Sequence, residues 1–66
     1  MVLVINGERA TFPEDATLKQ VVERSVRPGA AYAVEVNKTL VPRREHDART
    51  LVEGDVIEIV VLVGGG

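Results

Sequence analysis

Three glycines, Gly64, Gly65 and Gly66, end the chain and directly follow the apolar run of residues 60–63. β-Branched residues favour a buried strand, whereas glycine lacks a Cβ and keeps the greatest backbone freedom. We therefore expect a flexible tail that is thin enough to enter a narrow tunnel in another protein. The reactive group would be the carboxylate of Gly66, with Gly65 providing steric clearance beside it.

No other set of residues suggests catalysis. His46 is the single histidine and lies in a polar, charged segment, so we expect it to be solvated. Nothing ties Ser25 to His46, whereas a catalytic triad needs a nucleophile, a base and a carboxylate brought together. With one histidine and no cysteine, no metal site is expected. Phosphate-loop and dinucleotide motifs are absent. We expect that the chain is not an enzyme by itself and binds no cofactor.

Composition and charge exclude several classes of partner. The 66 residues carry a formal net charge of −2 and contain two aromatic residues, Phe12 and Tyr32. A nucleic-acid binder needs a basic stripe or a stacking platform, so no nucleic-acid partner is expected. No apolar stretch approaches the roughly 20 residues that cross a bilayer, so no membrane partner is expected either. The sequence predicts one small cytoplasmic domain.

A folded domain of strands and a helix must position the tail, and its first two predicted strands form a hairpin. Residues 2–5 are an apolar run followed by Asn6 and Gly7, which suit the positive φ angles of a type I′ turn. A second strand is predicted over residues 8–12, where Pro13 closes it because proline cannot donate to a ladder.

A short helix is predicted to follow. Thr17 and Gln20 have the spacing of a capping box. Apolar residues then recur at helical spacing, and Pro28 with Gly29 ends the pattern after roughly ten residues. Because so short a helix does not persist alone, it must pack on a sheet.

Three further strands are predicted, over residues 32–37, 39–41 and 56–63. The polar segment of residues 43–50 shows no clear period, and a turn of 3₁₀ helix is one interpretation. The order β-β-α-β-β-β predicts an α+β fold with the helix on one face of a mixed sheet. The first and last strands are the most apolar, so we place them side by side at the sheet centre.

The last strand is apolar on both faces. Alternation assigns residues 57, 59, 61 and 63 to the core, because Glu58 has the opposite parity and is expected to be exposed. Val60 and Leu62 then face away from the helix, and Val2 and Val4 of the first strand are expected to join them. Four aliphatic residues on an uncovered face predict a contiguous partner-binding patch.

The whole chain resembles the ThiS family, the sulfur carriers of thiamine (thiazole) biosynthesis. The order and spacing of several short motifs carry this resemblance. They are Asn6-Gly7, Thr17 with Val21-Val22, Val34-Glu35-Val36-Asn37, Val41-Pro42-Arg43, Glu53-Gly54-Asp55 and Gly65-Gly66. The resemblance implies a ubiquitin-like β-grasp domain over residues 1–63, with a mixed sheet of about five strands and one helix, and a flexible glycine tail over residues 64–66. Gly64 exceeds the usual pair of glycines.

The resemblance also implies a reaction cycle run by partner enzymes. A ThiF-like adenylating enzyme would use ATP and Mg²⁺ to activate the Gly66 carboxylate, and sulfur would then convert it to a thiocarboxylate. A ThiG-like thiazole synthase would take this sulfur into the thiazole ring. The sequence leaves open other sulfur acceptors, namely molybdopterin, a tRNA or a cysteine-forming enzyme. It also leaves open a ubiquitin-like protein tag and an interaction module whose tail is inert.

Overall fold

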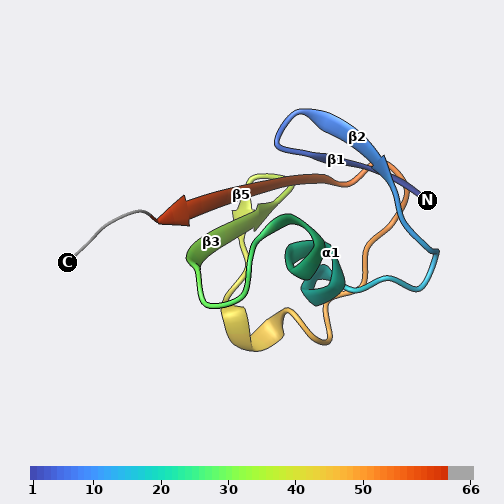
Figure 1. Ribbon diagram of the computed structural model, residues 1–66. Coiled ribbons are helices and arrows are strands. Elements are labelled where there is room, and N and C mark those ends of the chain that lie inside the picture. Colours follow the sequence, from blue (N-terminus) through green and yellow to red (C-terminus); the bar gives the residue numbers. More distant parts are fainter. Residues whose placement is uncertain (63–66) are drawn as a thin grey trace.

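A computed structural model describes residues 1–62 and forms a mixed five-stranded sheet with one helix across one face (Figure 1). The elements are β1 (Val2–Ile5), β2 (Glu8–Thr11), α1 (Leu18–Ser25), β3 (Ala31–Val36), β4 (Thr39–Leu40), the 3₁₀ helix η1 (Arg43–Glu45) and β5 (Val56–Leu62). This α+β architecture confirms the fold expected from the order of the elements. The predicted glycine tail lies outside the described residues.

The strands follow the order β2-β1-β5-β3-β4, with β1 and β5 parallel and adjacent at the centre. The prediction that the first and last strands are neighbours is therefore confirmed. Both hairpin turns have positive φ angles, at Asn6 (49°) and Gly7 (84°) in one and at Asn37 (50°) and Lys38 (70°) in the other. Such turns twist in the sense that the paired strands require.

Helix α1 begins with the predicted capping box. The Thr17 hydroxyl accepts a hydrogen bond from the Gln20 backbone N–H (3.4 Å), and the Gln20 side chain accepts one from the Thr17 N–H (2.9 Å). The helix spans eight residues and is thus shorter than expected. Its last residue is Ser25, and the backbone of Val26 is already extended, so the helix ends before Pro28.

The core lies between α1 and the sheet face that it covers. Leu18 and Val21 of the helix are fully buried, as are Leu3 of β1 and Ile57 of β5. The remaining buried apolar residues are Met1, Phe12, Ala16, Val22, Val26, Val34, Val36, Val41, Leu51 and Ile59. This single cluster joins both ends of the described chain, so β5 is held by the same packing that stabilises the helix.

The expectation that His46 is solvated is wrong, because this residue is buried and only 4% exposed. The turn of η1 directs its ring inward, where Nε2 donates a hydrogen bond to the Val41 carbonyl oxygen (2.9 Å). The ring also stacks on Tyr32, with 6.0 Å between centroids. The polar neighbours of His46 remain at the surface, which is why composition alone suggested a solvated side chain.

The prediction that residues 57, 59, 61 and 63 of β5 face the core is confirmed only in part. Ile57 and Ile59 are buried, but Val61 is 45% exposed. At this level the loop after α1 flanks the strand, and no residue of a helix within residues 1–62 lines the hollow beside Val61. Val63 lies beyond the part of the chain that the structure describes. Among residues 1–62 no helix has the length and apolar character that crossing a membrane requires.

Candidate functional site

The candidate site is the end of β5, because this strand leads directly into the glycines singled out in the sequence. Gly64, Gly65 and Gly66 lie outside the described residues, so their assigned roles remain predictions. The structure does describe the strand that precedes them. The site is therefore built from what anchors β5 and from the surfaces at its end.

Two groups hold the start of β5. The Asn37 side chain accepts a hydrogen bond from the Val56 N–H (3.0 Å) and donates one to the Asp55 carboxylate (3.0 Å). The second carboxylate oxygen of Asp55 accepts a hydrogen bond from the Val52 N–H (2.9 Å). Asp55 is 8% exposed, and these bonds satisfy its buried oxygens. The loop before β5 is thereby tied to the β3–β4 turn.

Asn6 holds the middle of β5 from the opposite edge. Its side-chain oxygen accepts a hydrogen bond from the Ile59 N–H (2.7 Å), and its side-chain nitrogen donates to the Ile59 carbonyl oxygen (3.1 Å). The amide thus binds the strand as a neighbouring peptide group would. Sequence reasoning assigned Asn6 and Asn37 to turns alone, because no local pattern connects Asn6 with a residue 53 positions later.

Val60 and Leu62 lie on the sheet face away from the helix, as predicted. They are 57% and 58% exposed, respectively. Their partners on β3 are Ala33 and Ala31, whose short side chains leave them uncovered. We call Val60, Leu62, Ala31 and Ala33 the outer apolar patch.

The other two residues expected in this patch lie apart from it. Val4 is level with Val56 at the start of β5, and both Val2 and Val4 are half-buried. Four strand residues, about 13 Å, separate the level of Val4 from Val60. Glu58, which faces Glu35 across the strands, lies between them. The prediction that the four residues form one contiguous patch is therefore wrong, because β1 pairs with β5 only at Val56 and Ile57 and does not reach Val60. The partner-binding role of these residues stays a prediction.

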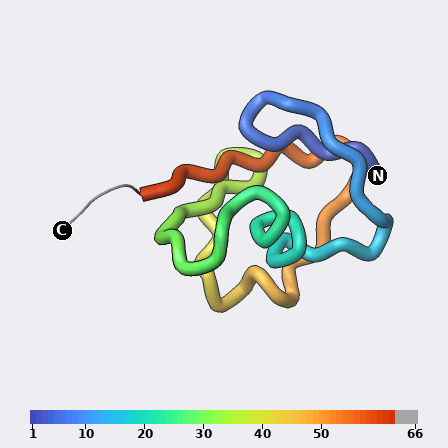
Figure 2. Tube along the Cα trace, viewed as in Figure 1, coloured from blue at the N-terminus to red at the C-terminus, as the bar shows by residue number. Residues whose placement is uncertain are grey.

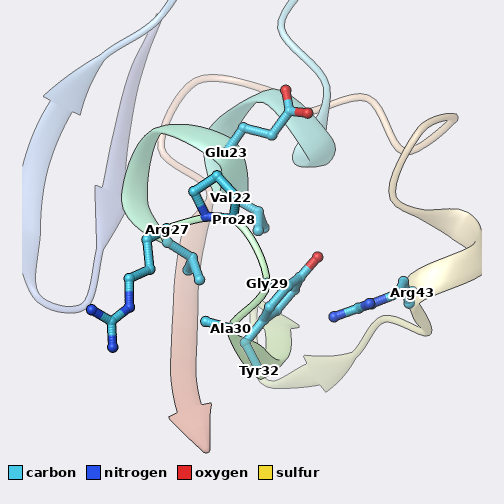
Figure 3. Close-up of a pocket in the computed structure, with 9 residues that line it drawn as sticks. Val22, Glu23, Arg27, Pro28, Gly29, Ala30, Tyr32 and Arg43 are labelled. Carbon is cyan, nitrogen blue, oxygen red and sulfur yellow. The ribbon is translucent and has the colours of Figure 1, made fainter.

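Two surface hollows lie beside the loop that follows α1, and residues 27–30 line both of them. One, of about 420 Å³, is lined by residues 27–31 together with Val61 and Leu62. The other, of about 250 Å³, lies at the end of α1, where the Arg43 guanidinium stacks 4.6 Å from the Tyr32 ring centroid (Figure 3). Within residues 1–62 no three potential metal-ligating side chains are grouped together. The end of β5 thus has exposed apolar side chains on its outer face, and Arg27 lines the hollow on its helix side.

The comparisons with known proteins agree with this arrangement. The family model described as the ThiS family matches residues 3–66. The chain is 35% identical, over 66 residues, to a thiazole synthase of Paramagnetospirillum magneticum, covering 100% of this chain but only 20% of that protein. It is 32% identical, over 62 residues, to the uncharacterized protein ycf40 of Porphyra purpurea, covering 94% of this chain and 87% of that protein.

Solved structures give the same result. The crystal structure of the thiamine biosynthesis protein ThiS from Geobacter metallireducens has a TM-score of 0.81 and 29% identity, with 100% of both chains covered. The solution structure of a thiamine biosynthesis protein from that organism has a TM-score of 0.78 and 29% identity, covering 100% of this chain and 88% of the other. The match in sequence and fold extends over nearly the whole chain. The protein therefore belongs to the ThiS family and has its ubiquitin-like β-grasp fold.

Proposed function

We propose that this protein is a sulfur carrier of thiamine biosynthesis and that the carboxylate of Gly66 carries the sulfur. The observation that supports this most strongly is the family match, which extends through residue 66 and so includes all three glycines. The similarity to solved thiamine biosynthesis proteins supports the same pathway. The protein would act as a co-substrate, with the chemistry performed by its partner enzymes.

The proposed cycle begins with activation of a poor electrophile. A carboxylate oxygen of Gly66 attacks the α-phosphorus of ATP on a ThiF-like enzyme, with Mg²⁺ stabilising the phosphate charge, and pyrophosphate leaves. A persulfide sulfur then attacks the acyl carbon of the adenylate, and AMP departs. Reductive cleavage of the resulting acyl disulfide by a thiol leaves a thiocarboxylate on Gly66. In the last step a ThiG-like thiazole synthase takes up the sulfur, and the carboxylate returns.

A thiazole synthase partner has independent support. The protein named thiazole synthase that resembles this chain is about five times longer, and this chain corresponds to 20% of it. A carrier-like segment within a protein of that name fits a carrier that delivers sulfur to this activity. We therefore propose thiazole formation as the acceptor reaction, ahead of molybdopterin, tRNA or cysteine synthesis and ahead of a protein tag.

The test is the intact mass of the protein. Incubation with ATP, Mg²⁺, the ThiF-like enzyme of the same genome and a persulfide source is expected to add about 16 Da, since sulfur replaces one carboxylate oxygen. The same reaction without ATP is the control. An unchanged mass would contradict the carrier function. Adducts joined to lysine side chains of other proteins would identify a protein tag instead.

The outer apolar patch is proposed to dock the adenylating enzyme and guide the tail into its active site. We expect Val60→Asp and Leu62→Asp each to weaken binding by about 2 kcal/mol, roughly a thirtyfold rise in Kd, because a carboxylate would be buried against an apolar surface. Isothermal titration calorimetry measures the Kd.

Val52→Asp is the matched control, because Val52 is also exposed (65%) and lies before the opposite end of β5. It should leave the Kd within about twofold. All three variants should keep the wild-type circular dichroism spectrum. A loss of folding in the Val60 or Leu62 variants would show that these residues stabilise the domain instead of binding a partner.

A further inference from the structure

Strand β5 extends beyond the strand that lies along one of its edges. β1 pairs with β5 only at Val4 with Val56 and at Ile5 with Ile57. Figures 1 and 2 show β5 continuing past the β1–β2 hairpin, while β3 still accompanies its other edge. The Asn6 side chain occupies the next position by binding both backbone groups of Ile59. No strand within residues 1–62 pairs with this edge beyond that point.

The hydrogen-bond pattern determines which backbone groups are left at the open edge. The Ile57 carbonyl accepts a hydrogen bond from the Asn6 N–H (2.9 Å), and both backbone groups of Ile59 also face this side. Because backbone groups alternate in direction along a strand, those of Val61 point the same way. The Val56 carbonyl, by contrast, points toward β3, where it accepts from the Asn37 N–H (2.7 Å). Val61 thus presents one donor and one acceptor to the open edge.

We propose that the open edge of β5 at Val61 binds an extended backbone segment of the adenylating enzyme as an added strand. This inference rests on the proposed function and specifies how the enzyme recognises the carrier. The added strand would continue the sheet from the point where Asn6 ends the pairing with β1. Recognition by main-chain hydrogen bonds at a sheet edge is a known mode of peptide binding.

The covalent length of the tail favours this occupant. Gly66 is five residues after Val61, so its carboxylate lies at most about 18 Å away along the chain. An enzyme that positions this carboxylate against ATP must therefore bring its own surface close to Val61. The open edge and the outer apolar patch belong to the same strand end, so one enzyme surface can contact both.

The flanks of the edge indicate the side chains that the enzyme segment needs. On the helix side, Arg27 lines the same groove as Val61, and Figure 3 shows its side chain pointing away from Tyr32 and Arg43. The ion pairs found within residues 1–62 do not include Arg27. On the opposite face lie Val60 and Leu62. Because side chains alternate between the two faces of a strand, we expect the enzyme segment to carry a carboxylate on the face toward Arg27 and apolar side chains on the other face.

A proline at position 61 tests the main-chain contact. Val61→Pro removes the free N–H but no bond to β3, because Val60 and Leu62 supply that ladder. We expect the Kd for the ThiF-like enzyme to rise about three- to tenfold, the effect of one lost hydrogen bond. Val61→Thr keeps both the N–H and the side-chain shape and should bind as the wild type does. Val61→Ala controls for side-chain packing, and an equal loss in this variant would overturn the proposal.

Hydrogen exchange on the wild-type protein provides a second measurement that does not depend on the folding of the proline variant. The Val61 amide should exchange rapidly in the free protein and at least tenfold more slowly in the complex. The Leu62 amide, which faces β3, should change little. An unchanged Val61 rate in a formed complex would overturn the proposal.

The mass assay separates this inference from the proposed function. If the wild type gains no sulfur, the carrier function itself fails. If the wild type is activated while Val61→Pro binds as tightly as Val61→Thr, only the strand addition fails. A concentration-dependent dimer that Val61→Pro abolishes would assign the edge to a second copy of this chain and would also overturn the proposal.

Discussion

Deletion of Gly66 is expected to abolish activation of the protein by the adenylating enzyme. Removing one residue withdraws the carboxylate by about 3.3–3.6 Å, whereas a displacement of about 1 Å already costs roughly a hundredfold in rate. The terminal carboxylate would then belong to Gly65 and could not reach the α-phosphate of ATP. The rate of pyrophosphate release should fall more than a hundredfold. Intact mass should show no gain of about 16 Da after addition of the persulfide source.

The deletion is also expected to leave the domain intact, because the buried cluster that joins α1 and the sheet is formed by residues between Met1 and Ile59. The midpoint of urea unfolding should match that of the wild type, and this measurement is the control for a folding defect. A companion variant, Gly65→Val, retains the chain length but adds a branched side chain beside the reacting group. It should also lose activation. A deletion variant that still forms the thiocarboxylate would refute Gly66 as the reacting residue.

Replacement of Ile57 by alanine is expected to bring the domain close to unfolding. Ile57 is fully buried at the centre of the sheet, where it pairs with Ile5 of β1 and Val36 of β3. Truncating such a side chain removes apolar burial and leaves a cavity, at a cost of about 2–5 kcal/mol. A domain of this size has a total stability of about 3–10 kcal/mol. The loss should be visible as a large drop in the urea midpoint.

Val56→Ala is the matched control for this prediction. Val56 is the preceding residue, but its side chain faces the other side of the sheet and is 40% exposed. Its truncation should cost less than about 1 kcal/mol. Similar losses in the two variants would show that the strand is stabilised by β-propensity and not by one-sided burial. At 37 °C the Ile57 variant should also be activated less completely, because less of it is folded.

Much of the fold could be predicted from the sequence because the relevant interactions are local. Asn6 and Gly7 have the residue types that a type I′ turn requires, and Thr17 with Gln20 forms the capping box at a spacing of three residues. The parity of β5 correctly assigned Ile57 to the core and Val60 to the outer face. Alternation along a strand is a property of the backbone, so it can be recognised before the neighbouring strands are known.

The errors concern residues whose surroundings come from distant parts of the chain. The burial of His46 depends on the Val41 carbonyl and the Tyr32 ring. Val61 has the parity of a core residue, yet no helix covers it. Val4 has the parity of the outer face, yet β1 is too short to reach the level of Val60. In each case the residue type or the side-chain direction could be inferred from the sequence, but the residues that lie beside it in the fold could not.

The sequence by itself determined the order of the elements and the alternation of β5, because these follow from residue types and short spacings. The glycine tail of residues 64–66 stays a prediction from the sequence. Only the tertiary structure decided where β1 ends beside β5. It also showed that Asn6, besides forming its turn, binds the backbone of Ile59 53 residues later. The open edge at Val61 results from these two facts. It cannot be recognised in the sequence, because strand pairing depends on how distant segments align and not on the residues of one segment alone.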